Sequence, residues 1–217
     1  VTLWISSGLA DEAAIPSPSG PSVGDTWTYV GSATGRGTSS VVLKVVKVEY
    51  GRIVVERSVG GARKDETMNS EWMEMTYSTP WTLIQVESGA KPTSLFPALP
   101  GRHSVRFVPG QDTIPFPLVV GSTHRQKVDV IDNASGNKRG VESVTTVRGW
   151  EDVVVPAGKF RAIRIDRDDT LVLSSSLSRS KHSFWYEPKV RWHVQTEVLD
   201  LDRNLRQTTK LVSFGVR

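Results

Sequence analysis

The chain has 217 residues, a formal net charge of +4 and no cysteine. A chain of this length can bury a core without disulfides or a bound metal, and the lack of cysteine excludes disulfides, thiol nucleophiles and thiolate zinc sites. Basic residues are scattered among acidic ones, which argues against nucleic acid as a partner because phosphate binding favours a clustered basic face. No apolar run approaches the roughly 18 residues that a membrane-spanning helix needs, so no transmembrane span is expected.

The first 21 residues differ in composition from the rest of the chain. Residues 1–10 are apolar, then small, and end in alanine, which resembles the end of a secretory signal peptide. A short N-terminal strand is the alternative. Residues 13–24 are rich in proline, serine and glycine and cannot sustain a helix or sheet. We therefore predict an N-terminal segment and linker over residues 1–21, and a single all-β domain over residues 22–217.

Residues 25–87 predict a first series of antiparallel strands. β-Branched and aromatic residues there alternate with polar ones, and turn signals separate the runs. The expected strands are 25–30, 41–50, 52–59, 66–77 and 81–87. Tyr50-Gly51-Arg52 is expected to form a hairpin bend between the second and third strands.

Residues 89–118 differ from both flanking regions because six prolines interrupt them. Proline lacks the amide donor that a central strand needs, while a solvated linker would not carry so many large apolar side chains. We predict an ordered apolar connection, not a regular strand, that crosses the edge or mouth of the sheet.

The strand pattern resumes after this connection. The expected strands are 123–131, 140–148, 151–155, 159–173, 183–187, 190–199 and 205–214, with a hairpin turn at residues 156–158. Residues 119–124 echo residues 22–27, which raises the hypothesis of two duplicated halves, 22–118 and 119–217.

Helical periodicity is almost absent, so little or no helix is expected. The run 190–199 alternates apolar with polar residues, which predicts Trp192 and Val194 buried on one face and Arg191 and His193 exposed on the other. The predicted fold is all-β, as a large curled antiparallel sheet or open barrel.

Three motifs give a family resemblance. They are GDTWTY at residues 24–29, VVVPAGKFRA at 153–162 and WYEPKVRW at 185–192. In this order they resemble the TapB-like and related bacterial envelope proteins of unknown function, in which Arg191 would be glycine. The resemblance implies a β-protein of the envelope, periplasmic or secreted, and is silent on activity.

Catalytic and metal-binding signatures are lacking in the sequence. The four histidines do not have metal-ligand spacing, and no Gly-x-Ser-x-Gly nucleophile turn occurs. Paired carboxylates for glycoside hydrolysis could come from any strands, and nothing selects a pair among Glu142, Glu151, Glu187 and Glu197. We therefore expect neither an enzyme nor a cofactor, and keep an envelope hydrolase as a minor alternative.

Aromatic residues are the most informative feature, since the chain has seven tryptophans. They form either a filled core or the wall of a groove for an apolar ligand, with the segment 92–117 as its lid. The candidate ligand-binding residues are Trp27, Trp72, Trp185, Trp192, Phe96, Phe107 and Phe116. The sequence thus favours a non-enzymatic domain that binds a lipid-like ligand or an envelope protein partner. The alternative is a structural component that pairs through a sheet edge.

Overall fold

The computed structural model describes residues 14–17, 20–61, 72–79, 81–89, 103–172 and 176–217. Within these ranges the secondary structure consists of strands, and no helix long and apolar enough to cross a membrane occurs there. The strands are β1 (Thr26–Ala33), β2 (Arg36–Glu49), β3 (Arg52–Gly61), β4 (Trp72–Ser78), β5 (Thr82–Gly89), β6 (His103–Asp112), β7 (Thr123–Asp132), β8 (Lys138–Val155), β9 (Gly158–Val172), β10 (Leu177–Glu187), β11 (Trp192–Asp200) and β12 (Leu205–Gly215).

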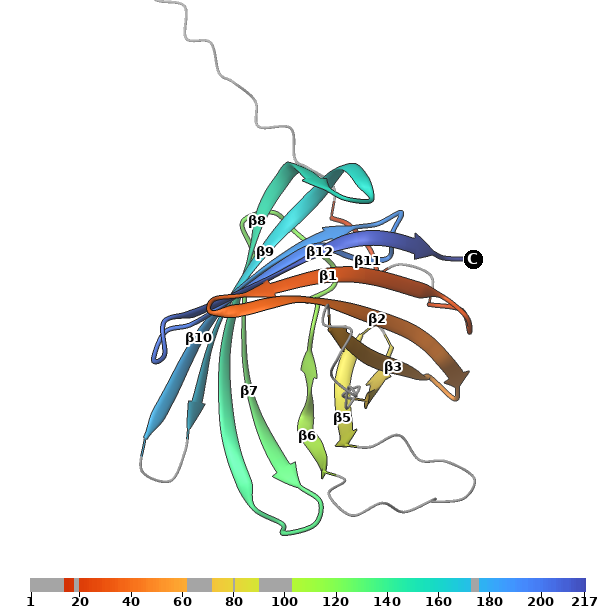
Figure 1. Ribbon diagram of the computed structural model, residues 1–217. Coiled ribbons are helices and arrows are strands. Elements are labelled where there is room, and N and C mark those ends of the chain that lie inside the picture. Colours follow the sequence, from red (N-terminus) through yellow and green to blue (C-terminus); the bar gives the residue numbers. More distant parts are fainter. Residues whose placement is uncertain (1–13, 18–19, 62–71, 80, 90–102, 173–175) are drawn as a thin grey trace, which may run out of the picture.

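The strands form one antiparallel sheet that curls until its two end strands meet. Each strand pairs with its neighbours in the sequence, and β1 pairs with β12 to close a barrel (Figure 1). The predicted all-β antiparallel fold class is confirmed. A barrel with this many strands is wider than the eight-stranded kind that side chains alone fill, so its interior needs either large side chains or a cavity.

Local sequence explains the two hairpins expected from turn signals. Tyr50 and Gly51 have φ values of 49° and 73°, the left-handed pair that a tight hairpin bend requires. The second hairpin joins β8 to β9 at Pro156-Ala157, and Gly158 has φ of 134°. The predicted strands 140–148 and 151–155 are one strand, β8, whose register shifts between Val147 and Gly149.

The prediction that residues 89–118 contain no regular strand is wrong for β6. This strand pairs with both β5 and β7. Pro109 is tolerated because the β5–β6 register shifts there, so its missing amide falls at an irregularity. At the same point Gly110 lies so near β5 that a Cβ would be 3.1 Å from the carbonyl oxygen of Leu83. Residues 92–102 of the predicted lid lie outside the described residues.

The exposure predicted for His193 is also wrong. His193 is buried, as are the predicted Trp192 and Val194. The physical reason is an irregularity in the β10–β11 pairing: Trp185 pairs with Gln195, but Tyr186 pairs with His193. Val194 is therefore an extra residue in β11, and the simple alternation of inward and outward side chains stops there.

One end of the barrel interior is filled by aromatic side chains. Trp27, Trp81, Trp192 and Tyr77 pack against one another with ring centroids 4.4–6.3 Å apart. The Trp27 indole donates a hydrogen bond to the Val190 carbonyl at 2.8 Å. This aromatic cluster, completed by the buried residues Ile114 and Leu118 after β6, closes the end of the barrel that carries the β4–β5 and β10–β11 turns.

Candidate functional site

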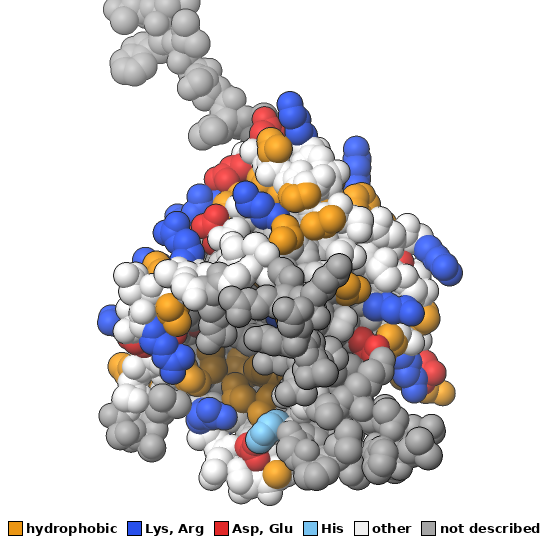
Figure 2. All heavy atoms as spheres, in the orientation of Figure 1, with side chains coloured by type: hydrophobic (Ala, Val, Ile, Leu, Met, Phe, Trp, Pro, Cys, Tyr) orange, Lys and Arg blue, Asp and Glu red, His pale blue; other side chains and the backbone are white. Residues whose placement is uncertain are grey.

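A cavity of about 280 Å³ lies inside the barrel on the other side of the aromatic cluster. We call this cavity the lumen. Its apolar wall comes from strands on both sides of the barrel, namely Tyr29, Val41, Leu43, Met75, Tyr77, Phe184, Trp192 and Val198. Its polar lining is Arg57, Thr113, Arg167, His193, Thr196, Gln207 and Thr209. Figure 2 shows a hollow in the lower half of the molecule with hydrophobic side chains inside it.

β9, β10 and β11 bring the polar groups of the lumen together. On β9, Ile163 and Ile165 are fully buried, and the same alternation turns Arg167 and Asp169 to the inside. Arg167 Nε lies 3.0 Å from Asp169 Oδ2. His182 of β10 also approaches Asp169, at 3.3 Å from Nε2 to Oδ2.

The Phe184 ring is a common packing partner of Arg167 and His193. The Arg167 guanidinium carbon lies 5.1 Å from the centre of the Phe184 ring, and the His193 ring stacks on the same phenyl at 4.9 Å. Arg167 and His193 are thereby held at one place on the lumen wall. An arginine over an aromatic face gains cation–π attraction, more so where water is excluded.

Burial determines the charge state of His193, which lines the lumen, and of His182 on β10. Burial and the nearby Arg167 lower the pKa of His193 to about 3. The same two causes lower the pKa of His182 to about 4, although Asp169 and Asp168 oppose the shift. Both imidazoles are therefore neutral near pH 7, and the arginines supply the positive charge of the lumen.

The structure separates the predicted ligand-binding residues. Trp192 lines the lumen, and Trp27 belongs to the aromatic cluster. Trp185 is outside the lumen: its indole donates to Glu151 at 2.7 Å, and Arg164 lies 5.4 Å from its ring. Phe107 and Phe116 are half-buried, and Phe116 packs on Tyr186 with centroids 5.4 Å apart. Phe96 and the Trp72 side chain lie outside what the structure describes.

The polar lumen residues were missed by sequence reasoning, although a signal for them exists. Arg167 and Asp169 continue the parity of Ile163 and Ile165, so alternation alone places them inside. No comparable signal exists for His193, because the extra residue in β11 reverses its expected side.

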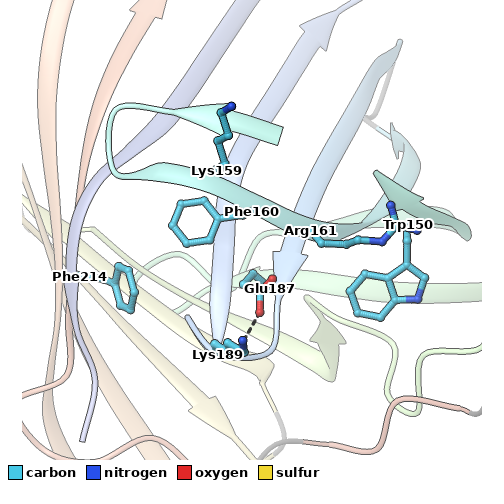
Figure 3. A pocket seen from close by; sticks show the side chains of 7 residues that line it. All are labelled: Trp150, Lys159, Phe160, Arg161, Glu187, Lys189 and Phe214. Atoms are coloured by element: carbon cyan, nitrogen blue, oxygen red, sulfur yellow. Dashed lines mark hydrogen bonds between the residues drawn. The ribbon is translucent and has the colours of Figure 1, made fainter. Parts of the chain in front are cut away.

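A second hollow, of about 560 Å³, lies on the outside at the closed end of the barrel. The hairpin of β8 and β9, the β10–β11 turn and the end of β12 surround it (Figure 3). The Phe160 and Phe214 rings lie 6.2 Å apart there, and the buried Glu187 accepts a hydrogen bond from the Lys189 amide at 3.0 Å. This outer groove combines aromatic rings with three cationic side chains, from Lys159, Arg161 and Lys189.

The carboxylates considered for hydrolysis have separate structural partners. Glu142 pairs with Lys127, Glu151 with Trp185, and Glu197 with Gln195. In the part of the chain that the structure describes, no group of three or more acidic or histidine side chains is placed to hold a metal ion.

Tyr186 and Arg191 lie on either side of the turn that joins β10 to β11. Tyr186 is fully buried beside His193, with ring centroids 6.4 Å apart, and burial raises the pKa of its phenol. Arg191 takes φ of 59°, the left-handed region that favours glycine, and it stands where the predicted TapB-like resemblance would place glycine. The tight turn is thus made with arginine, whose guanidinium lies 3.8 Å from the buried carboxylate of Asp25.

Comparisons with known proteins relate the chain to two solved structures. One is a candidate exported protein with a YmcC-like fold from Bacteroides fragilis, with a TM-score of 0.52, 15% identity, and 94% of this chain and 100% of that chain covered. The other is a candidate lipoprotein from Parabacteroides distasonis, with a TM-score of 0.51, 16% identity, and 93% and 97% covered. No family model and no curated protein matches the sequence. The likeness establishes the fold, which is shared with these two proteins, and the TapB-like resemblance stays a prediction.

Proposed function

We propose that this protein is a non-enzymatic binding protein of the bacterial envelope, periplasmic or secreted, whose lumen holds the apolar part of a lipid-like ligand. The observation that carries the proposal is the lumen itself. One end of the barrel is packed with aromatic rings, yet about 280 Å³ beyond them is left open and walled mainly by apolar side chains. Ligand pockets have this character, being concave and apolar with a few polar groups.

The envelope location is supported by the two similar structures, which are described as an exported protein and a lipoprotein. It also fits the signal-like residues 1–10, which lie outside the described residues.

The strand-addition alternative is less favoured by the topology. In the closed strand order each described strand has a neighbour on both sides, and closure removes the free edge that strand addition uses. A protein partner on another surface is the remaining alternative. The outer groove, where Phe214 is 40% exposed, offers aromatic surface for such a partner.

A neutral apolar dye tests the lumen directly. We expect N-phenyl-1-naphthylamine to bind saturably and to gain fluorescence. Val198→Phe places a ring in the lumen and should weaken binding by on the order of tenfold or more, since the site has little spare volume. Val212→Phe makes the same change at an exposed position of β12 and should leave binding unchanged. An absence of saturable binding, or equal binding by both variants, would contradict the proposal.

A further inference from the structure

The charged side chains of the lumen wall already have partners. Of the described residues that line the lumen, Arg57 and Arg167 are charged and none is acidic. Arg167 pairs with Asp169 at 3.0 Å, and the two side chains are only 12% and 13% exposed. Arg57 is half-buried and has an interaction of its own. The wall therefore presents no free charge to a ligand.

An ionic head group would gain little inside this wall. A carboxylate would have to compete with Asp169 for Arg167, and an ammonium group would lie among side chains of its own charge. Removing either ion from water is costly unless it finds an opposite charge. The electrostatics of the lumen thus favour a ligand without charge.

Most neutral polar groups of the lining are bonded within the protein. The hydroxyls of Thr196 and Thr209 lie 2.6 Å apart and bond to each other. The Tyr29 hydroxyl donates to the His193 carbonyl, and the Thr113 hydroxyl donates to another backbone carbonyl. These side chains have their main hydrogen bonds without a ligand.

His193 differs from these groups because its imidazole lacks a partner. Nδ1 is buried and has no hydrogen bond within the part of the chain that the structure describes, and the residue is 4% exposed. Burial lowers its pKa to about 3, so near pH 7 the neutral ring has one N–H donor and one acceptor nitrogen. A buried polar group without a partner is unfavourable. In the wall of a cavity, such a group indicates where a ligand or an ordered water binds.

This imidazole lies at the closed end of the lumen. Its ring centre is 4.9 Å from that of Trp192, which belongs to the aromatic cluster, and 4.9 Å from that of Phe184. Aromatic rings therefore surround the free polar group. A hydrogen bond made in such surroundings is stronger than one made in water.

The volume limits the size of the ligand. A water molecule occupies about 30 Å³ in the liquid, so the 280 Å³ lumen holds on the order of nine groups of water or methylene size. An alkyl chain of about eight carbons with one hydroxyl group has this size.

Resting on the proposed function, we propose that the lumen selects an uncharged single-chain ligand whose hydroxyl head group bonds to the imidazole of His193. A hydroxyl both donates and accepts, so it fits the neutral ring whichever nitrogen carries the proton. The apolar wall, with Leu43 and Val198 among its residues, takes the chain. Ionised single-chain lipids, such as fatty acids at neutral pH, are disfavoured by the same wall.

Displacement of bound N-phenyl-1-naphthylamine near pH 7.5 tests the charge preference. 1-Octanol, octanoate and octylamine have the same chain, and at this pH they are neutral, anionic and cationic. We expect 1-octanol to displace the dye at concentrations on the order of tenfold lower than either ion, because an ion loses its hydration without gaining a partner charge. Displacement by either ion at the same or lower concentrations would overturn the proposal.

1-Octanethiol tests the hydroxyl contact, because it is also neutral at this pH but its thiol forms only weak hydrogen bonds. The measured quantity is the ratio of the displacing concentrations of 1-octanethiol and 1-octanol, compared between variants, so that their different affinities for water cancel. His193→Phe keeps a ring in place and removes both nitrogens, and it should lower the ratio severalfold. His193→Gln keeps a neutral donor and acceptor, and it should retain most of the preference for 1-octanol.

Thr196→Val combined with Thr209→Val is the matched control within the lumen. The two hydroxyls satisfy each other, and replacing both partners by apolar groups of similar shape is nearly neutral. The ratio should therefore stay as in the parent. The affinity of each variant for the dye shows whether its lumen is intact. A ratio that falls in the threonine variant and not in His193→Phe would place the contact elsewhere and contradict the proposal.

The outcomes separate the two proposals. If the dye binds saturably but the ions displace it as well as 1-octanol does, the uncharged head group is wrong and the apolar lumen site stands. The same conclusion follows if His193→Phe keeps the preference for 1-octanol over 1-octanethiol. If neither the dye nor any octyl compound binds, the proposed function fails and the head-group proposal fails with it.

Discussion

The barrel has two seams at which its sequence halves meet, and they are built differently. β1 to β6 fall in the first predicted half and β7 to β12 in the second. The β1–β12 seam has eight residue pairs, from Thr26–Gly215 to Ala33–Gln207. The β6–β7 seam has four, from Val105–Asp132 to Val108–Asp129.

The strand that begins each half is nevertheless introduced by the same turn. Each turn, at residues 22–25 and 119–122, makes two backbone hydrogen bonds with one valine of the next strand. The amide of the glycine donates to the carbonyl of this valine. The amide of the valine donates to the carbonyl of the residue that follows the glycine. The bonds are Gly24–Val45 and Val45–Asp25 in the first half, and Gly121–Val147 and Val147–Ser122 in the second, all 2.8–3.0 Å long. Both valines precede a register shift in their strand. The two segments that share the short sequence echo thus share this turn geometry, and the duplication stays a hypothesis.

The two turns diverge at one position. Asp25 is fully buried, and its carboxylate accepts hydrogen bonds from the amides of Ser22 and Arg217, at 2.9 and 3.0 Å, beside the Arg191 guanidinium. Its counterpart Ser122 is exposed. The β1–β12 seam thus contains the buried carboxyl group of Asp25. Its contacts join the start of β1 to Arg217 and to Arg191 of the β10–β11 turn.

The β6–β7 seam uses a neutral side chain where backbone pairs are missing. Gln126 of β7 donates to the Gly110 carbonyl at 2.8 Å and accepts from the Asp112 amide at 3.0 Å. Its amide side chain therefore takes the place of a peptide group of β7. The difference between the seams indicates that closure at β1–β12 depends on charge and burial, while closure at β6–β7 depends on a few hydrogen bonds.

Among the substitutions at the two seams, removing Asp25 should have the largest effect on stability. Asp25→Ala leaves the half-buried amides of Ser22 and Arg217, and the Arg191 guanidinium, without their acceptor, and we expect a loss of about 3–5 kcal/mol in the free energy of unfolding. Ser122→Ala, at the matching position of the other half, should stay within about 0.5 kcal/mol of the parent. Urea unfolding of both variants measures the difference. Equal losses would show that the β1–β12 seam does not depend on the buried carboxylate.

The strands and hairpins were largely predictable from the sequence because they depend on local patterns. β7, β9 and β12 follow from β-branched runs, and the bends at Gly51 and Gly158 follow from turn residues. β6 was not predicted, because proline argues against a central strand unless the register shift that accommodates it is known. That shift depends on β5, which is a tertiary fact.

The candidate site was less predictable. Tryptophan content indicated an aromatic interior, but whether twelve strands leave a cavity depends on barrel closure, which no local pattern encodes. Arg167 could have been placed inside by parity with Ile165. The burial of His193 could not have been predicted, because it depends on the extra residue Val194.

Acid should also lower the stability of the barrel, through His193 on β11 and His182 on β10. The carbonyl of His193 accepts a hydrogen bond from the Tyr29 hydroxyl of β1 at 2.8 Å. The pKa values of His193 and His182 are lowered to about 3 and 4, so the unfolded chain binds protons more readily below pH 6.5. Stability is therefore complete above pH 6.5 and falls with pH below it, by up to about 1.4 kcal/mol per pH unit for each histidine.

Urea unfolding between pH 7.5 and 4.5 measures this dependence. We expect His193→Gln to flatten the curve, and His103→Gln, at an exposed position of β6, to follow the parent. A parent whose stability is constant over this range would show that His193 and His182 are accessible to protons without loss of structure.

The smallest effect is expected at the β6–β7 seam. Gln126→Leu removes both side-chain bonds to β6 and leaves the Asp112 amide without that acceptor, at a cost of about 1–3 kcal/mol. Because the seam has four backbone pairs, the loss should appear first as local opening, with faster hydrogen exchange at Asp112 than at the amides of β1. Arg125→Leu changes an exposed neighbour and should leave exchange unaltered. If Gln126→Leu speeds exchange equally at β1 and β6, the barrel opens as one unit, and the contrast between the two seams has no energetic counterpart.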